Sequence, residues 1–215
     1  MADPEYVHYI LIIDRSGSMN TIKTDTQGGI RAFIDKQLEG VDGSKRTVSL
    51  YQFDTEHDQV HDFGLLEKAK TYELVPRGGT ALLDACGFAI TKTGERLAAM
   101  PEDKRPGYVM VVIATDGQEN SSREYTRAQV KEMIQHQRDK YDWRFTYIGA
   151  NQDSFSEAGS IGIAAPSALN YMSTGRSTSS AWASAGAAVS AGTVATSTGI
   201  YYSAGQRDAA MASQP

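Results

Sequence analysis

Two uninterrupted apolar segments, each as long as a β-strand and each followed closely by an aspartate, constrain the fold most. Tyr6–Ile13 (YVHYILII) leads into Asp14, and Tyr108–Ala114 (YVMVVIA) leads through one threonine into Asp116. Apolar residues that run on without alternation are typical of parallel strands, which crossover helices cover on both faces. Both segments are far shorter than the roughly 20 residues of a membrane-spanning helix. The sequence therefore predicts the centre of a parallel α/β sheet and no association with a membrane.

Strand and helix patterns alternate along most of the chain. The predicted further strands are Thr47–Phe53, Val60–Phe63, Arg144–Ile148 and Ala168–Tyr171, and the predicted helices are Ile22–Leu38, Leu82–Met100 and Thr126–Lys140. Such alternation indicates a doubly wound, Rossmann-like α/β sheet with helices on both faces. Because Val60–Phe63 follows its predecessor after a short acidic segment, we expect these two strands to form an antiparallel hairpin.

Composition divides the chain near residue 172. We expect one domain over residues 1–172, followed over residues 173–215 by a segment dominated by Ala, Ser, Gly and Thr. A helix of small residues can approach its own sheet closely, so we favour a closing helix with some loose tail. The alternative is a small-residue surface that packs against another subunit and makes the protein an oligomer or part of a larger assembly.

Charge and cysteine content exclude several classes of protein. A net charge of −5 and a pI near 5.4 argue against nucleic-acid binding, which needs a basic surface. The first residues show no basic region followed by an apolar one, so we expect no secretory signal. A single cysteine, Cys86, leaves no intramolecular disulfide framework. These features predict a cytoplasmic protein, or a virion component assembled in the cytoplasm.

Oxygen-bearing side chains follow the first apolar strand at regular spacing. Asp14, Ser16 and Ser18 are two residues apart, which in extended backbone points all three side chains the same way. Gly17 allows the chain to curve so that the oxygens converge. One carboxylate and two hydroxyls suit a hard cation, Mg²⁺, Mn²⁺ or Ca²⁺, rather than zinc or copper.

Two further segments supply oxygens where such a site needs them. Asp116 stands at the carboxyl end of the second apolar strand, and Thr80 follows two glycines just before a helix. Ligands of open α/β sheets bind beyond the carboxyl ends of the strands, where the winding reverses. If the two apolar strands are neighbours there, Asp14 and Asp116 face each other.

These segments together resemble the metal-ion-dependent adhesion site (MIDAS) of von Willebrand factor A domains. The family pattern of Asp-x-Ser-x-Ser, then Thr, then Asp is matched in order by Asp14, Ser16, Ser18, Thr80 and Asp116. The surrounding strings DRSGSM, GGTAL and TDGQEN are also similar to the family, and the likeness extends from Tyr6 to about Tyr171. Stand-alone prokaryotic or phage-encoded members are the most similar in type.

The resemblance implies a fold, a cofactor and a partner. The implied sheet has six strands in the order 3-2-1-4-5-6, with one antiparallel edge strand. The implied ion is Mg²⁺, with Mn²⁺ or Ca²⁺ as alternatives, bound through the three hydroxyls and, directly or through water, the two aspartates. An Asp or Glu carboxylate of a protein partner would complete the coordination shell, so the implied function is binding and not catalysis.

Enzymatic alternatives lack their partners in the sequence. An aspartate-nucleophile phosphatase needs a second aspartate two residues after the first, where this chain has Ser16. The phosphate-binding motif of P-loop proteins is absent. A serine hydrolase needs a histidine near Ser16 or Ser18, and none is placed there by the sequence. His57 and His61 lie in the acidic hairpin, which we interpret as a solvated sheet edge rather than a second metal site.

Overall fold

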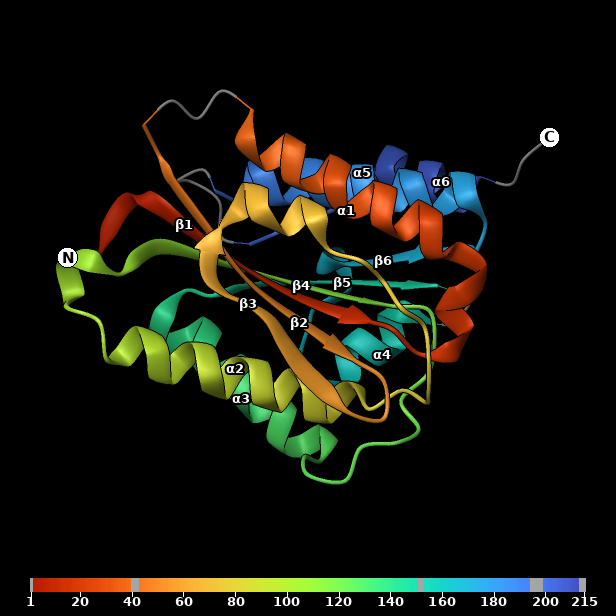
Figure 1. Cartoon of the computed structure of the whole chain (residues 1–215), viewed down its shortest axis with the longest axis horizontal. Coiled ribbons are helices and arrows are strands. Elements are labelled where there is room, and N and C mark those ends of the chain that lie inside the picture. The colour runs from red at the N-terminus through yellow and green to blue at the C-terminus, as the bar shows by residue number, and fades with distance from the viewer. Residues whose placement is uncertain (1, 40–42, 151–152, 194–198, 213–215) are drawn as a thin grey trace.

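The computed structural model describes residues 2–39, 43–150, 153–193 and 199–212. Its centre is a six-stranded sheet in the order β3-β2-β1-β4-β5-β6 (Figure 1). β2 and β3 pair antiparallel, and the other neighbouring strands pair in parallel. The strands are β1 Asp3–Asp14, β2 Lys45–Phe53, β3 His57–Leu65, β4 Pro106–Thr115, β5 Arg144–Ala150 and β6 Ala168–Tyr171. The predicted topology is confirmed, including the antiparallel edge strand.

Helices cover both faces of this sheet. In Figure 1, α1, α5 and α6 lie on one side, and α2 and α3 lie on the other. The helices are α1 Lys23–Leu38, α2 Leu82–Ala98, α3 Arg127–Tyr141, α4 Ser154–Ser160, α5 Gly175–Gly192 and α6 Ala204–Met211. Within the described residues, no helix combines the length and the hydropathy that crossing a membrane requires.

The continuous apolar pattern of β1 arises because the strand feeds two cores. Val7, Tyr9 and Leu11 belong to the cluster beneath α1 and α5, whereas Ile10 and Ile12 belong to the cluster beneath α2 and α3. Side chains alternate between the faces of a strand, so a strand covered on both sides must be apolar at every position. This burial fixes β1 at the middle of the sheet.

Element boundaries differ modestly from the predicted ones. β3 extends over His57–Leu65, well beyond the predicted Val60–Phe63, because an edge strand can pair along one side while its side chains stay exposed. A 3₁₀ turn, Gly17–Ile22, precedes α1. The short helices α4 and α6 were not predicted, since their few polar and small residues carry little periodic signal.

The small-residue segment forms α5, which packs against α1. Trp182 of α5 is buried, and its ring meets Phe33 edge-on at 6.0 Å between centroids. Most small residues of α5 are buried inside this chain. Instead of a loose tail, residues 204–211 form a further helix, and residues 213–215 lie outside the described residues. The division of the chain at residue 172 stays a prediction.

Two adjacent glycines of α1 offer a matched test of this packing. A Cβ added to Gly29 would lie 2.4 Å from the Trp182 ring, whereas one added to Gly28 would meet nothing within 4 Å. Gly29→Ala is therefore expected to lower the free energy of unfolding by about 1–3 kcal/mol. Gly28→Ala should raise it by up to about 1 kcal/mol, because alanine favours helix. Urea denaturation of both variants measures the difference, and equal stabilities would contradict close packing of α5 on α1.

Candidate metal centre

The predicted site lies at the carboxyl ends of the two central strands. β1 and β4 are parallel neighbours in register, with Ile13 opposite Ala114. Asp14 and Asp116 therefore leave the sheet side by side, at the point where the chain winds outwards in both directions.

The side-chain oxygens of the five predicted residues come together there. Ser16 Oγ lies 3.0 Å from Ser18 Oγ, and Ser18 Oγ donates a hydrogen bond to Asp116 Oδ1 at 2.6 Å. Gly117 shows where the remaining oxygens point. A Cβ added at Gly117 would lie 3.0 Å from Thr80 Oγ1, 3.6 Å from Ser18 Oγ and 3.9 Å from Asp14 Oδ2. Oxygens from all three segments thus lie around Gly117, where a side chain would crowd them.

Burial shapes the charge of this site. Asp14 is fully inaccessible, and burial raises its pKa to about 6. Hydrogen bonds from the Thr115 hydroxyl, at 2.5 Å, and the Ser16 amide, at 2.6 Å, oppose that rise, while the charge of Asp116 adds to it. Burial also raises the pKa of Asp116, against the hydrogen bond from Ser18. Two carboxylates held this close and this dry favour a bound cation, which would offset both charges.

The donor set fits a hard divalent ion. Three hydroxyls and two carboxylates are the oxygen ligands that Mg²⁺, Mn²⁺ and Ca²⁺ take in proteins. In the described part of the chain, no cluster of three or more His, Cys, Asp or Glu residues could hold a metal ion. The predicted site, with only two carboxylates, does not depend on such a cluster.

The loop after β4 fixes Thr80 in place. Asn120 pairs with both backbone groups of Thr80, since its Oδ1 accepts from Thr80 N and its own N donates to Thr80 O, each at 3.0 Å. Glu119 accepts from Leu83 N in the first turn of α2, and Asp84 of α2 accepts from three successive amides of the loop. Sequence reasoning noted the TDGQEN string but missed these roles, because the partners lie more than thirty residues away.

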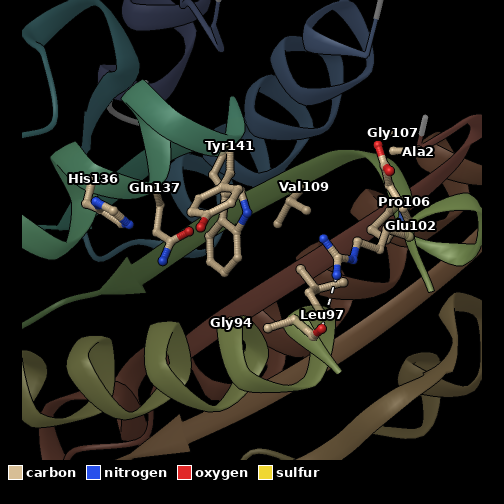
Figure 2. A pocket seen from close by; sticks show the side chains of 13 residues that line it. Ala2, Gly94, Leu97, Glu102, Pro106, Gly107, Val109, His136, Gln137 and Tyr141 are labelled. Atoms are coloured by element: carbon tan, nitrogen blue, oxygen red, sulfur yellow. Dashed lines mark hydrogen bonds between the residues drawn. The ribbon is translucent and has the colours of Figure 1, made fainter. Parts of the chain in front are cut away.

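One cavity lies at the opposite end of β4 from the candidate site. A hollow of about 390 Å³ opens between the end of α2, the start of β4 and the end of α3 (Figure 2). Leu97, Arg105, Val109, His136 and Trp143 are among its lining residues. It sits at the amino end of β4, whereas Asp116 follows the carboxyl end. This cavity is therefore separate from the candidate site, which converging polar groups define.

Comparison with known proteins finds similarity in structure alone. No model of a known family and no curated protein matches the sequence. A von Willebrand factor type A structure from Catenulispora acidiphila is similar over 84% of this chain and 42% of that chain, with a TM-score of 0.60 and 18% identity. Proximal thread matrix protein 1 from the mussel byssus is similar over 82% of this chain and 44% of its own, with a TM-score of 0.57 and 16% identity.

Two further solved structures are similar to this chain in fold, and one of them has a metal ion in its MIDAS motif. Another structure of the byssus protein has a zinc-occupied MIDAS motif; it covers 79% of this chain and 42% of its own, with a TM-score of 0.55 and 15% identity. The von Willebrand factor domain of the pilus tip protein Mfa5 from Porphyromonas gingivalis covers 78% of this chain and 90% of its own, with a TM-score of 0.51 and 12% identity. This chain has the fold of von Willebrand factor A domains, and it spans less than half the length of the Catenulispora and byssus chains.

Proposed function

We propose that this protein is a metal-dependent interaction module, which binds an Asp or Glu carboxylate of a partner protein through a divalent cation. The observation that carries the proposal is the convergence of oxygens from three separate segments around the space beside Gly117. The residues that would hold the ion are Asp14, Ser16, Ser18, Thr80 and Asp116.

Charge balance explains why such a site would bind a carboxylate. Asp14 and Asp116 offset a 2+ charge between them, while the hydroxyls of Ser16, Ser18 and Thr80 add none. A bound divalent ion would supply an electrophilic position that an external carboxylate can occupy. Because Asp14, Ser16 and Thr80 are buried, attraction between charges there is stronger than in bulk water. Mg²⁺ is the ion that we propose, with Mn²⁺ or Ca²⁺ as alternatives, and the zinc in the byssus protein supports divalent occupancy of this kind of site.

We propose binding without catalysis, in a cytoplasmic protein of prokaryotic or phage type. Ser16 pairs with Ser18, and Ser18 donates to Asp116, which suits ligands better than nucleophiles. His8 is buried against Thr47, and the His57 ring packs on Phe88 at 4.5 Å between centroids. The names of the pilus tip and byssus matrix neighbours support a partner that is a protein.

Self-association through α5, or a place in a virion or other assembly, stays a prediction that light scattering would test.

Calorimetric titration of chelator-treated protein with Mg²⁺, Mn²⁺, Ca²⁺ and Zn²⁺ tests the site. One ion per chain is expected, and Thr80→Val should weaken its binding at least about tenfold, because it removes a ligand without changing shape. Thr71→Val is the matched control, since that exposed hydroxyl bonds only the Lys68 carbonyl. Partner capture from a lysate should then occur with wild-type protein in Mg²⁺ and disappear with chelator or with Thr80→Val. Capture that is undiminished in chelator would overturn the mechanism.

A further inference from the structure

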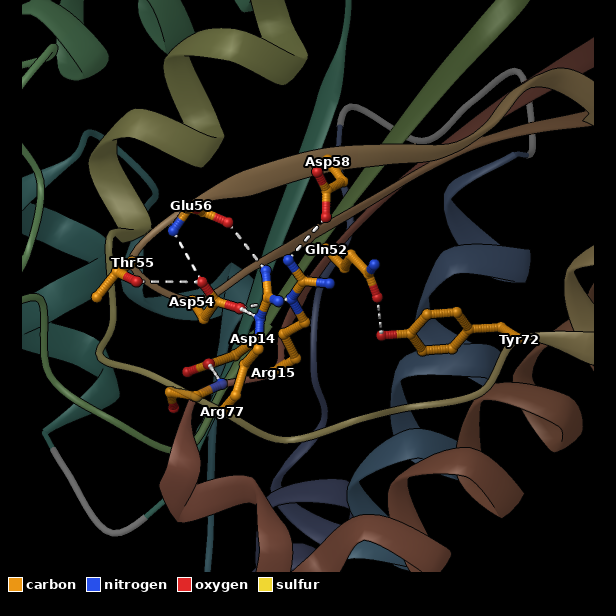
Figure 3. Close-up of polar contacts among 10 residues, drawn as sticks. Asp14, Arg15, Gln52, Asp54, Thr55, Glu56, Asp58, Tyr72 and Arg77 are labelled. Atoms are coloured by element: carbon orange, nitrogen blue, oxygen red, sulfur yellow. Dashed lines mark hydrogen bonds and ion pairs between the residues drawn. The ribbon is translucent and has the colours of Figure 1, made fainter.

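A buried carboxylate beside the candidate site joins two arginines from different loops. Asp54 follows β2 directly, and its side chain is 1% exposed. Its Oδ2 lies 2.7 Å from Arg15 Nε in an ion pair and accepts a hydrogen bond from Arg77 Nε at 2.6 Å (Figure 3). Asp54 Oδ2 thus binds two loops at once. Through Arg15 it binds the loop that carries Ser16 and Ser18, and through Arg77 it binds the loop that leads to Thr80.

Backbone hydrogen bonds join the same three segments. Arg15 N donates to Phe53 O at 2.7 Å, and Arg77 N donates to Arg15 O at 2.8 Å. Gly17 N donates to Gly78 O at 3.2 Å, and Ala81 N donates to Asp54 O at 2.7 Å. Gly78 adopts a φ of +66°, which brings its backbone close to Asp54, so a side chain there would be strained. The relative position of the two ligand-bearing loops therefore depends on the segment around Asp54.

Both arginines need an acidic partner, because they flank a site for a cation. The Arg15 side chain is 8% exposed and stands between Asp14 and Ser16 in the chain. Burial alone would raise the pKa of Asp54, but the hydrogen bond from Arg77, the Glu56 amide and the two guanidinium charges outweigh it and lower that pKa. Asp54 is therefore a carboxylate at neutral pH and offsets positive charge next to the site.

We propose that Asp54 is a positioning residue for the candidate ion site, which clamps the Ser16–Ser18 loop to the Thr80 loop through Arg15 and Arg77. The part of this inference that concerns ion affinity rests on the proposed function. The part that concerns loop coupling holds for the ion-free protein as well.

Asp54→Asn and Asp58→Asn form a matched pair. Asp58 also pairs with Arg15, at 2.7 Å from Nη2, but its side chain is 53% exposed and bonds no second loop. Both substitutions remove one negative charge near the site. We expect Asp54→Asn to weaken Mg²⁺ or Mn²⁺ binding at least about tenfold in calorimetry, in the range of other supporting residues of metal sites, and Asp58→Asn to weaken it less than about threefold.

Arg77→Gln distinguishes a positioning role from a charge effect, because the two change the affinity for a cation in opposite directions. Its side chain is 54% exposed, so its loss leaves the core intact. Removing a positive charge alone would tighten cation binding, whereas loosening the Thr80 loop weakens it. We expect weaker binding, by at least about threefold. Arg123→Gln, at an exposed position of the loop after β4, removes the same charge without touching the clamp and should not weaken binding.

Amide hydrogen exchange in chelator measures the coupling without any ion. The amides of Gly17, Arg77 and Ala81 should exchange faster in Asp54→Asn and Arg77→Gln than in wild type, and at the wild-type rate in Asp58→Asn. Unchanged exchange in both clamp variants would overturn the inference. So would Arg77→Gln binding the ion more tightly than wild type. If wild-type protein binds no divalent ion, the proposed function fails, and the exchange measurement still decides whether Asp54 couples the loops.

Discussion

Asp14→Asn is expected to stabilise the ion-free protein at pH 7.5 and, at the same time, to remove its response to divalent ions. Asp14 is fully buried beside Asp116, and burial raises its pKa from 3.8 to about 6. A carboxyl with a raised folded pKa stabilises the fold where it is protonated, so stability falls as pH rises from about 4 to about 6 and stays lower above that range. The shift corresponds to roughly 3 kcal/mol.

Asparagine removes that penalty and can keep the local hydrogen bonds. Its oxygen can accept from the Ser16 amide, and its amide can donate to the Thr115 hydroxyl, which can turn to the carbonyl of Gly117 at 3.0 Å. We therefore expect a gain of about 1–3 kcal/mol in chelator. Ion binding should fall at least about a hundredfold, because one of two charged ligands is gone.

Thermal unfolding of wild type and Asp14→Asn, each with chelator and with Mg²⁺, measures both effects. Wild type should gain about 2.7 kcal/mol from ion at a hundred times its dissociation constant, and the variant, which binds at least about a hundredfold more weakly, should gain less than about 0.5 kcal/mol. Asp139→Asn, at an exposed position of α3, controls for a charge change far from the site. An Asp14→Asn protein that is less stable in chelator, or that gains as much stability from Mg²⁺ as wild type, would contradict the assignment.

His8 is expected to make the protein sensitive to acid. Its ring stacks on Phe63 at 3.8 Å between centroids, and its Nδ1 lies 2.8 Å from Thr47 Oγ1. Nε2 is buried and has no hydrogen-bond partner among the described residues. Burial, helped by the charge of Lys45, lowers the pKa of His8 from 6.5 to about 3.

The sign of this shift sets the pH range. Between about pH 6.5 and pH 3 the unfolded chain binds a proton at His8 and the folded chain does not, so stability falls as pH falls. The full shift corresponds to roughly 5 kcal/mol. His8→Phe keeps a flat ring against Phe63 and removes the titration. Thr47 would still bond Tyr6, because the two hydroxyl oxygens lie 2.8 Å apart.

Urea unfolding at a series of pH values from 7.5 to 4 tests this expectation. The difference in stability between His8→Phe and wild type should grow as pH falls, since other titrating groups are common to both proteins. His136→Phe, at an exposed position of α3, is the matched control and should follow wild type. A difference that stays constant with pH would show that His8 titrates normally in the fold.

The centre of the fold could be predicted because burial on two faces leaves a plain pattern in the sequence. The predicted segments Tyr6–Ile13 and Tyr108–Ala114 are apolar at almost every position, so their place at the centre of the sheet follows. β1 and β4 extend beyond these segments, to Asp3–Asp14 and Pro106–Thr115, because polar strand ends carry no such pattern. β3 was predicted too short. Its backbone pairs with β2 along its whole length, but its exposed side chains carry no apolar pattern that would reveal that length. α6 was missed because a helix of eight small and polar residues depends on packing against α5 and β6 rather than on its own periodicity.

The sequence predicted the candidate ligands of the site but not the residues that support them. Asp14, Ser16, Ser18, Thr80 and Asp116 could be picked out because their spacing and strand ends imply convergence. The residues that hold them, Asp54 and Asn120, act through contacts across twenty to forty residues. Asn120 stands in the TDGQEN string, but that string does not show which residue it contacts. Sequence reasoning finds the groups that would touch an ion more readily than those that support them.

The hydrogen bond between Ser18 and Asp116 spans 98 residues of chain. Its two ends meet only after β1 and β4 have paired, and that parallel pairing is non-local and slow to form. An unfolded or half-folded chain therefore offers no site, so an ion would bind the finished fold alone and would transfer its full binding free energy to stability. In a cell where divalent ions fluctuate, we expect the fraction of this protein that is folded to follow the ion concentration.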